Sequence, residues 1–70
     1  DMANYNVIDI DPGMDYAPGE EVIGTVEAAT PDDAIAKVMW DVAGINIRTM
    51  PQEDYALYLK PILKAVEVAS

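Results

Sequence analysis

Two residue types that carry much of protein chemistry are missing from this 70-residue chain, which has no cysteine and no histidine. Without cysteine there can be no disulfide and no thiolate ligand for zinc. Without histidine the chain lacks the commonest transition-metal ligand and the usual general base. Its single serine is the last residue, Ser70, so a nucleophilic triad cannot be assembled. We therefore expect a protein that is not an enzyme and that carries no cofactor or bound metal.

Basic residues are also scarce, and the first half of the chain has none. Residues 1–33 contain nine acidic side chains and no basic one, whereas residues 34–70 contain four of each, so the whole net charge of −9 arises in the first half. This pattern argues against nucleic acid as a direct ligand, because binding phosphates requires clustered lysine and arginine. No apolar run approaches the roughly 20 residues of a membrane span. The first residues show no signal-peptide pattern, so the cytoplasm is the expected compartment.

What the chain does contain is a hydrophobic fraction of 51%, enough to predict a folded domain spanning residues 1–70. Residues 4–11 and 20–29 are rich in strand-forming residues, and the "DPG" and "APG" turn signals between them predict a hairpin. Gly24 inside the second strand indicates a bulge or a close backbone approach. Alternation in the first strand places Asn6, Ile8 and Ile10 on one face, and Tyr5, Val7, Asp9 and Asp11 on the other.

The clearest local signal is "TPDD" at residues 30–33, which predicts the start of a helix. Thr30 is a favourable N-cap, Pro31 fits the first helical position, and two aspartates suit the positive end of the helix dipole. The helix is expected to run over residues 31–43 and to end at Gly44. We expect its apolar stripe to pack against Ile8, Ile10 and alternate residues of 22–28, with Trp40 half covered; the stripe consists of Ala34, Ile35, Val38, Met39 and Val42.

The last third is more ambiguous. Residues 45–49 are predicted as a short strand, 50–54 as a turn or one helical turn, and 62–69 as a further strand. Residues 55–60 alternate as a strand would, with a helix over 52–60 as the alternative, and Pro61 forbids a regular helix across 55–68. The predicted fold class is α+β: a small antiparallel sheet of β-β-α-β order, with one helix packed on one face. Residues 22–44 are similar to the strand–cap–helix piece of small β-β-α-β proteins, including small non-catalytic subunits of multicomponent oxygenases.

Residues 9–21, "DIDPGMDYAPGEE", carry five acidic side chains and no basic one. Counted from Asp9 as the first position of a calcium loop, Asp11, Asp15 and Glu20 fall at positions 3, 7 and 12. An EF-hand also needs an oxygen ligand at position 5 and a glycine at position 6, and it is flanked by helices. Because this stretch meets none of these conditions, a solvated acidic loop is favoured over a calcium site.

The function favoured by this charge pattern is a non-catalytic acidic protein-binding module that docks on a basic, nucleic-acid-binding surface of a protein partner. Small phage- and plasmid-encoded inhibitors share this size and charge, an analogy only. We expect one of the tyrosines or Trp40 to be an aromatic anchor, such as Tyr16 in the acidic stretch. The predicted partner-binding residues are Asp9, Asp11, Asp15, Tyr16, Glu20, Glu21, Asp32 and Asp33. The alternatives are a small structural or adaptor subunit, a homo-oligomer built through sheet edges, a weak calcium-binding module, and a surface that only confers solubility.

Overall fold

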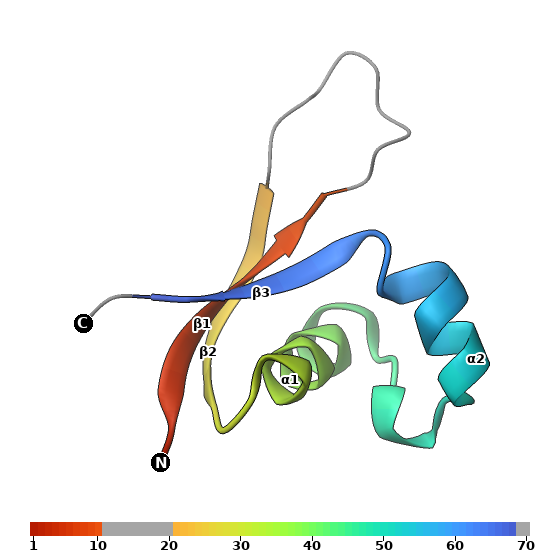
Figure 1. Cartoon of the computed structure of the whole chain (residues 1–70), viewed down its shortest axis with the longest axis horizontal. Helices are drawn as coiled ribbons and strands as arrows, with labels where there is room; N and C mark the ends of the chain where they lie inside the picture. Colours follow the sequence, from red (N-terminus) through yellow and green to blue (C-terminus); the bar gives the residue numbers. More distant parts are fainter. Residues whose placement is uncertain (11–20, 69–70) are drawn as a thin grey trace.

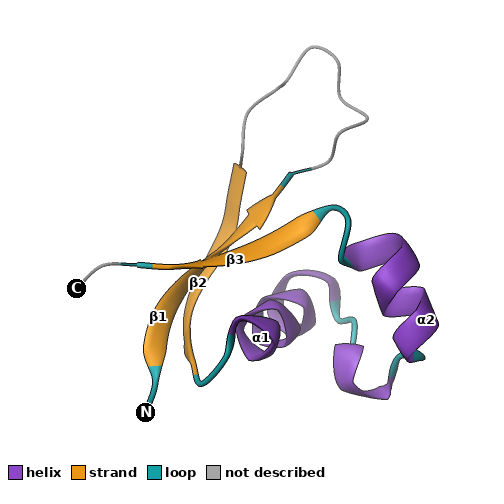
Figure 2. Ribbon diagram, in the orientation of Figure 1, coloured by secondary structure: helices purple, strands orange, loops and turns teal. Residues whose placement is uncertain are grey.

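The computed structural model describes residues 1–10 and 21–68, which form a three-stranded antiparallel sheet with helices on one face (Figures 1 and 2). The strands are β1 (Ala3–Asp9), β2 (Glu21–Ala28) and β3 (Leu63–Glu67), and their order in the sheet is β2-β1-β3. The main helix, α1 (Pro31–Ala43), lies against the sheet. The predicted α+β class, with a small antiparallel sheet and a helix packed on it, is confirmed.

The β1–β2 hairpin contains both features that Gly24 suggested. Val7 lies opposite Gly24 while Ile8 lies opposite Val22, so Ile23 is an extra residue in β2 and the ladder has a bulge there. Gly24 also lies under α1: a Cβ atom added to it would be 2.9 Å from Cγ1 of Val38. The missing side chain therefore allows the helix to approach the strand closely at this point.

Helix α1 begins and ends where the sequence predicts. The hydroxyl of Thr30 accepts a hydrogen bond from the backbone N–H of Asp33 at 3.1 Å, and Thr30 itself is extended. At the other end, Gly44 adopts the left-handed conformation with φ of 67°. Its N–H donates to the carbonyl oxygen of Trp40, which satisfies one of the helix's last acceptors. Local capping chemistry alone thus defines both ends of this helix.

The face of β1 that supports the helix differs from the prediction. Tyr5 and Val7 are buried in the core, with Val7 completely inaccessible. Ile8 is also buried but does not belong to the core cluster, because successive residues of a strand point to opposite faces. The prediction that α1 packs on Ile8 and Ile10 is therefore wrong. Apolar residues lie on both faces of β1, so alternation could not decide which face the helix covers.

The predicted stripe of α1 is wrong at its last member. Val42 has 62% of its surface exposed, whereas the other four predicted positions are buried and Ala36 is buried with them. The helix ends one residue later, at Ala43, and all residues from Trp40 to Ala43 are exposed. Trp40 is 59% exposed, in agreement with its position beside the stripe.

Residues 47–49 and 52–59 form helical turns, so the strands predicted for 45–49 and 55–60 are wrong. Ile47–Thr49 is a 3₁₀ turn, because the side chain of Asn46 accepts from the N–H of Arg48 and its carbonyl accepts from Thr49. The short helix α2 (Gln52–Asp54) confirms the expected helical turn, and it continues into a π-helical turn, Tyr55–Leu59. The alternative of a helix over 52–60 is thus the better description.

The burial of this segment explains the error. Tyr55 and Leu59 are buried and Leu57 is 67% exposed, which is the spacing of a helix and not of a strand. Over six residues an apolar alternation fits either period, so the pattern could not separate the two. Strand β3 follows Pro61 and confirms the strand predicted within 62–69.

Candidate functional site

Two of the predicted partner-binding residues face each other at one end of the hairpin. Asp9 ends β1, Glu21 begins β2, and the two are directly paired in the ladder. Like charges directly opposite each other are unfavourable in a sheet. Asp11, Asp15, Tyr16 and Glu20 lie outside the described residues. The structure therefore brings together one acidic pair of the predicted docking surface.

Asp32 and Asp33 lie at the start of α1, which follows the other end of β2 from Glu21. Asp33 forms an ion pair with Arg48, and Asp32 accepts a hydrogen bond from the hydroxyl of Tyr55 at 3.4 Å. Burial of the phenol, with the negative charge and hydrogen bond of Asp32 in addition, raises the pKa of Tyr55. These two carboxylates thus hold the helical segments of residues 47–59 against α1, and they are separated from the Asp9–Glu21 pair by the length of β2.

Among the aromatic residues that the structure describes, only two are exposed. Tyr5 and Tyr55 are buried in the core, whereas Trp40 and Tyr58 are 59% and 67% exposed. Trp40 is the single tryptophan of the chain. Large aromatic side chains with an exposed ring are enriched at the centres of protein interfaces. Of the aromatic residues in 1–10 and 21–68, Trp40 and Tyr58 are therefore the two whose rings are open to contact by another molecule.

Trp40 lines a cleft of about 510 Å³ between β2 and α1. Val26 and Glu27 form the β2 side of this cleft; Ala36, Lys37, Trp40 and Asp41 form the α1 side. The helical residues lie three and four positions apart, so they share one face of α1. The volume is within the range of ligand-binding clefts in proteins, about 300–1,000 Å³. We call this feature the β2–α1 cleft.

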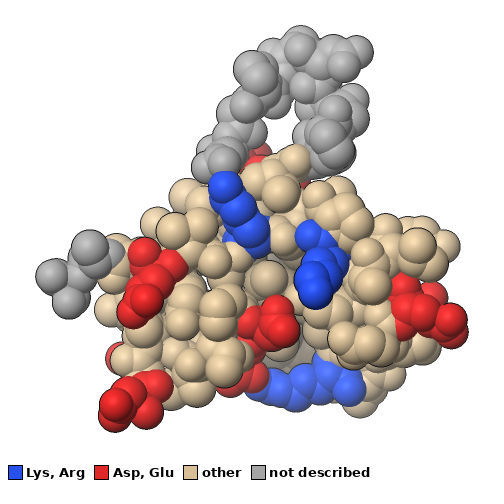
Figure 3. Space-filling view, in the orientation of Figure 1, with Lys and Arg blue, Asp and Glu red and all other residues tan. Residues whose placement is uncertain are grey.

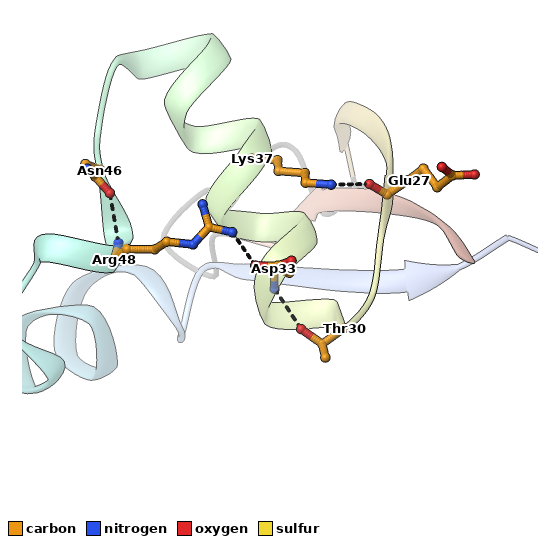
Figure 4. Close-up of polar contacts among 6 residues, drawn as sticks. All are labelled: Glu27, Thr30, Asp33, Lys37, Asn46 and Arg48. Carbon is orange, nitrogen blue, oxygen red and sulfur yellow. Dashed lines mark hydrogen bonds and ion pairs between the residues drawn. The ribbon is translucent and has the colours of Figure 1, made fainter. Parts of the chain in front are cut away.

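Asn46 and Arg48, from the segment after α1, complete the β2–α1 cleft. Figure 4 shows Arg48 reaching along the helix to Asp33, which in turn is bound to the cap residue Thr30. Arg48 is also fixed through its backbone by the side chain of Asn46 at 3.1 Å. The charge of Arg48 is therefore already balanced by a carboxylate within the fold.

The β2 side of the cleft is a sheet edge. Val68 donates to the carbonyl of Asn4 and Ile10 donates to that of Ile62, so the even-numbered residues of β1 direct their backbone groups toward β3. In an antiparallel ladder, the β2 residues that lie opposite these even-numbered residues direct their own N–H and C=O groups away from β1. Those residues are Thr25 and Glu27, which lie opposite Asn6 and Asn4. Within residues 1–10 and 21–68 no strand pairs with this side of β2.

One lysine covers part of this edge. The ammonium group of Lys37 donates to the backbone carbonyl of Glu27 at 2.7 Å. Figure 4 shows this contact between α1 and β2, and it shows the Glu27 side chain directed away from the helix. The carbonyl of Glu27 is thus turned outward and accepts a hydrogen bond from a flexible side chain. Lysine on a sheet edge is a common protection against unwanted strand pairing.

The surface offers charge but no metal centre in the described part of the chain. Residues 1–10 and 21–68 contain no group of three or more acidic side chains that could hold a metal ion. The calcium ligands considered from the sequence, Asp11, Asp15 and Glu20, lie outside these residues. Figure 3 shows acidic and basic side chains interspersed on one face. No described helix has the length and apolar character needed to cross a membrane.

Comparisons with known proteins give no family for this chain. No protein-family model, curated protein or solved structure was found to match it.

The β2–α1 cleft was missed by the reasoning from sequence. Its helical residues do share a signal, because Lys37 and Asp41 are four residues apart with Trp40 between them, beside the apolar stripe. The sequence places Trp40 off the stripe, but nothing in it indicates that β2 is an edge strand. The sheet order, which places β1 in the centre, is what creates the cleft.

Proposed function

We propose that this chain is a non-catalytic acidic protein-binding module whose partner is a protein with a basic surface. The observation that carries this proposal is Trp40, the single tryptophan, 59% exposed in the β2–α1 cleft beside Asp41, with the Glu27 side chain on the other face of the neighbouring edge strand. An exposed tryptophan supplies the apolar anchoring energy of an interface, and surrounding carboxylates supply complementarity to a cationic partner.

The charge of the chain supports the same proposal. A net charge of −9 on 70 residues repels itself, and two of its acidic residues, Asp9 and Glu21, lie opposite each other in the ladder. Such a surface accelerates association with a protein of opposite charge. A protein that binds nucleic acid presents a basic surface of this kind, and an acidic module that covers it would act as an inhibitor.

The anchor differs from the one that the sequence favoured. Tyr16 lies outside the described residues, and the proposal now rests on Trp40. The acidic residues Asp11, Asp15, Glu20 and Glu21 remain proposed contributors to steering, because long-range attraction depends on charge and not on contact.

Capture from a lysate of the organism that encodes the chain tests this function. Three variants of the immobilised protein are compared with the parent at low and high salt. The first, Trp40→Ala, removes the anchor. The second changes Asp11, Asp15, Glu20 and Glu21 to the corresponding amides. The third is the matched control, with amides at Asp1, Glu53, Asp54 and Glu67, so that it loses the same number of charges.

We expect the parent and the control to retain the same basic protein at low salt and to release it at high salt, because added ions screen the attraction. Trp40→Ala and the variant with four amides in residues 11–21 should retain much less of it. If all four proteins capture the same amount, then neither Trp40 nor the acidic residues of 11–21 contribute to docking, and if salt does not change the capture, then charge does not drive it. Either result contradicts the proposed function.

A further inference from the structure

We propose that the β2–α1 cleft binds an extended, arginine- or lysine-rich segment of the partner, which adds to the free edge of β2 as a fourth strand. This inference rests on the proposed function and specifies how the partner is bound. Three observations support it: the outward backbone groups of β2, the tryptophan beside them, and the carboxylates that border both.

The backbone of β2 provides the first part of the site. Thr25 and Glu27 direct their N–H and C=O groups away from β1, at alternate positions as strand addition requires. On this side Lys37 contacts the carbonyl of Glu27 through its ammonium group. A lysine side chain can swing away from a surface carbonyl, whereas a paired strand could not be displaced so readily. Within the described residues, the outer edge of β2 is therefore blocked by the side chain of Lys37, which an incoming strand can displace.

The α1 wall provides the second part. A strand added to β2 would place alternate side chains toward α1, where they meet Ala36, Trp40 and Asp41. An arginine or lysine at such a position can lie over the indole ring of Trp40 and direct its charge toward the neighbouring carboxylate of Asp41. Cations are attracted to the face of tryptophan more strongly than to that of other aromatic rings.

The carboxylate of Glu27 provides the third part, on the face of the sheet opposite α1. The side chain of Glu27 points away from α1 (Figure 4), so it lies on the face where the remaining side chains of an added strand would point. Opposite charges on neighbouring strands stabilise their pairing. Within the described chain neither Glu27 nor Asp41 has an ion-pair partner, whereas Arg48 is balanced by Asp33. The two carboxylates thus favour a basic side chain on each face of an added strand once the ammonium group of Lys37 has moved away from the carbonyl of Glu27.

Recognition of this type combines two contributions. Main-chain hydrogen bonds along the edge give affinity, and pockets for alternate side chains give specificity. The β2–α1 cleft offers the main-chain groups of an edge strand and, beside them, a helix surface that can contact the side chains of the segment. Lys37 acts as a competitor of the incoming strand, since it occupies an acceptor that the strand needs.

A panel of synthetic peptides tests this inference with the intact protein. Each peptide has the length of β2, 8 residues, with capped ends, lysine or arginine at positions of both strand faces and valine, leucine or phenylalanine at the remaining positions. Binding is followed through the fluorescence of Trp40, which is the only tryptophan present. For the best peptide, a second version carries N-methyl groups on the alternate amides that would face β2, which removes hydrogen bonds and leaves the side chains and charge unchanged.

Two variants form a matched pair. Lys37→Ala uncovers the carbonyl of Glu27, and Lys60→Ala removes the same charge at an exposed position away from the cleft. Both variants remove one positive charge, and because Lys37 also lies in the cleft, the N-methylated peptide, which keeps its charge, separates the effect on hydrogen bonding from the local effect on charge. Both are compared with the parent by urea unfolding, which verifies that each is folded under the conditions of the titration.

We expect saturable binding of at least one unmodified peptide and binding of its N-methylated form that is weaker by about tenfold or more. Lys37→Ala should raise the affinity for the unmodified peptide more than Lys60→Ala does. Equal binding of the two peptide forms would overturn strand addition, as would equal effects of the two lysine variants. No response to any peptide would also overturn it, while salt-sensitive, Trp40-dependent capture would leave the proposed function standing. If capture fails as well, the proposed function is wrong.

Discussion

Replacing Gly24 with alanine should destabilise the fold, because this position has no room for a side chain. A Cβ atom there would lie 2.9 Å and 3.0 Å from the two γ-carbons of Val38. Val38 is only 2% exposed, and a valine in a helix has one strongly preferred rotamer, so it cannot turn aside. Overpacking of this kind costs about 1–3 kcal/mol. The lower backbone entropy of alanine in the unfolded chain returns about 0.5–1 kcal/mol.

With the middle of each range, the net loss of stability is about 1 kcal/mol. This is a sizeable fraction of the stability of a 70-residue domain, which is about 0.05–0.15 kcal/mol per residue. Urea unfolding followed by far-ultraviolet circular dichroism measures it directly. A double-mutant cycle isolates the cause, because Val38→Ala alone leaves a cavity and the new methyl group at position 24 would occupy part of it.

The pair Gly24→Ala and Val38→Ala should consequently be less destabilising together than the sum of the two single changes. Two results would refute the close contact between β2 and α1 that underlies this reasoning. One is a Gly24→Ala variant at least as stable as the parent. The other is strict additivity in the double variant.

Two further predictions concern the ends and the support of α1. Thr30→Ala should lower stability by about 1 kcal/mol, seen in urea unfolding, and an unchanged midpoint would show that the cap at Asp33 is not used. The pKa of the Tyr55 phenol is raised in the folded protein, so the folded state holds this proton more tightly than the unfolded chain does. The contribution of Tyr55 to the free energy of unfolding should therefore be complete below pH about 10 and should be lost as the pH rises through the pKa of the folded state. Tyr55→Phe should reduce that alkaline loss, and an equal loss in both proteins would contradict the assignment.

The parts of the fold that could be predicted from the sequence are those determined by neighbouring residues. Thr30, Pro31 and Gly44 define α1 through its own capping groups, which need no tertiary contact. The hairpin strands follow from alternation and turn residues close in the chain. Gly24 was informative for the same reason, since a glycine inside a strand is typical of a bulge or a close backbone approach.

The parts that could not be predicted depend on contacts distant in the sequence. Which face of β1 is buried is decided by where α1 packs, and both faces carry apolar residues, Val7 on one and Ile8 on the other. The segment from 45 to 60 has strand-forming residues but folds as helical turns, because Tyr55 and Leu59 fill the core from one side of a helix. Tertiary packing overrides weak local preference in such short segments.

The candidate site belongs to this second group. Its carboxylates and its tryptophan could be identified in the sequence, but a cleft between α1 and an edge strand exists only because β1 occupies the centre of the sheet. The residues favoured from sequence were those of the acidic stretch, where charge is densest. Charge density along the chain identifies where attraction originates, and it does not identify where a partner makes contact.

The same charge bears on which strand can pair with β2. A free edge is a general hazard, because any exposed strand can add to it, including that of a second copy. Two copies of this chain would each bring a net charge of −9, and pairing their β2 edges would bring Glu27 of one copy close to acidic residues of the other. Like charges across a ladder oppose pairing, and opposite charges favour it.

Lys37 adds a second barrier to pairing at this edge, since its hydrogen bond to Glu27 must be exchanged for one from the incoming strand. In the proposed complex, a basic segment would replace that lysine with its own N–H and would gain the attraction of Glu27 and Asp41. A second acidic copy loses the hydrogen bond of Lys37 and adds repulsion. Under the proposed strand addition, the charges at this edge would favour a basic segment over the β2 strand of a second copy.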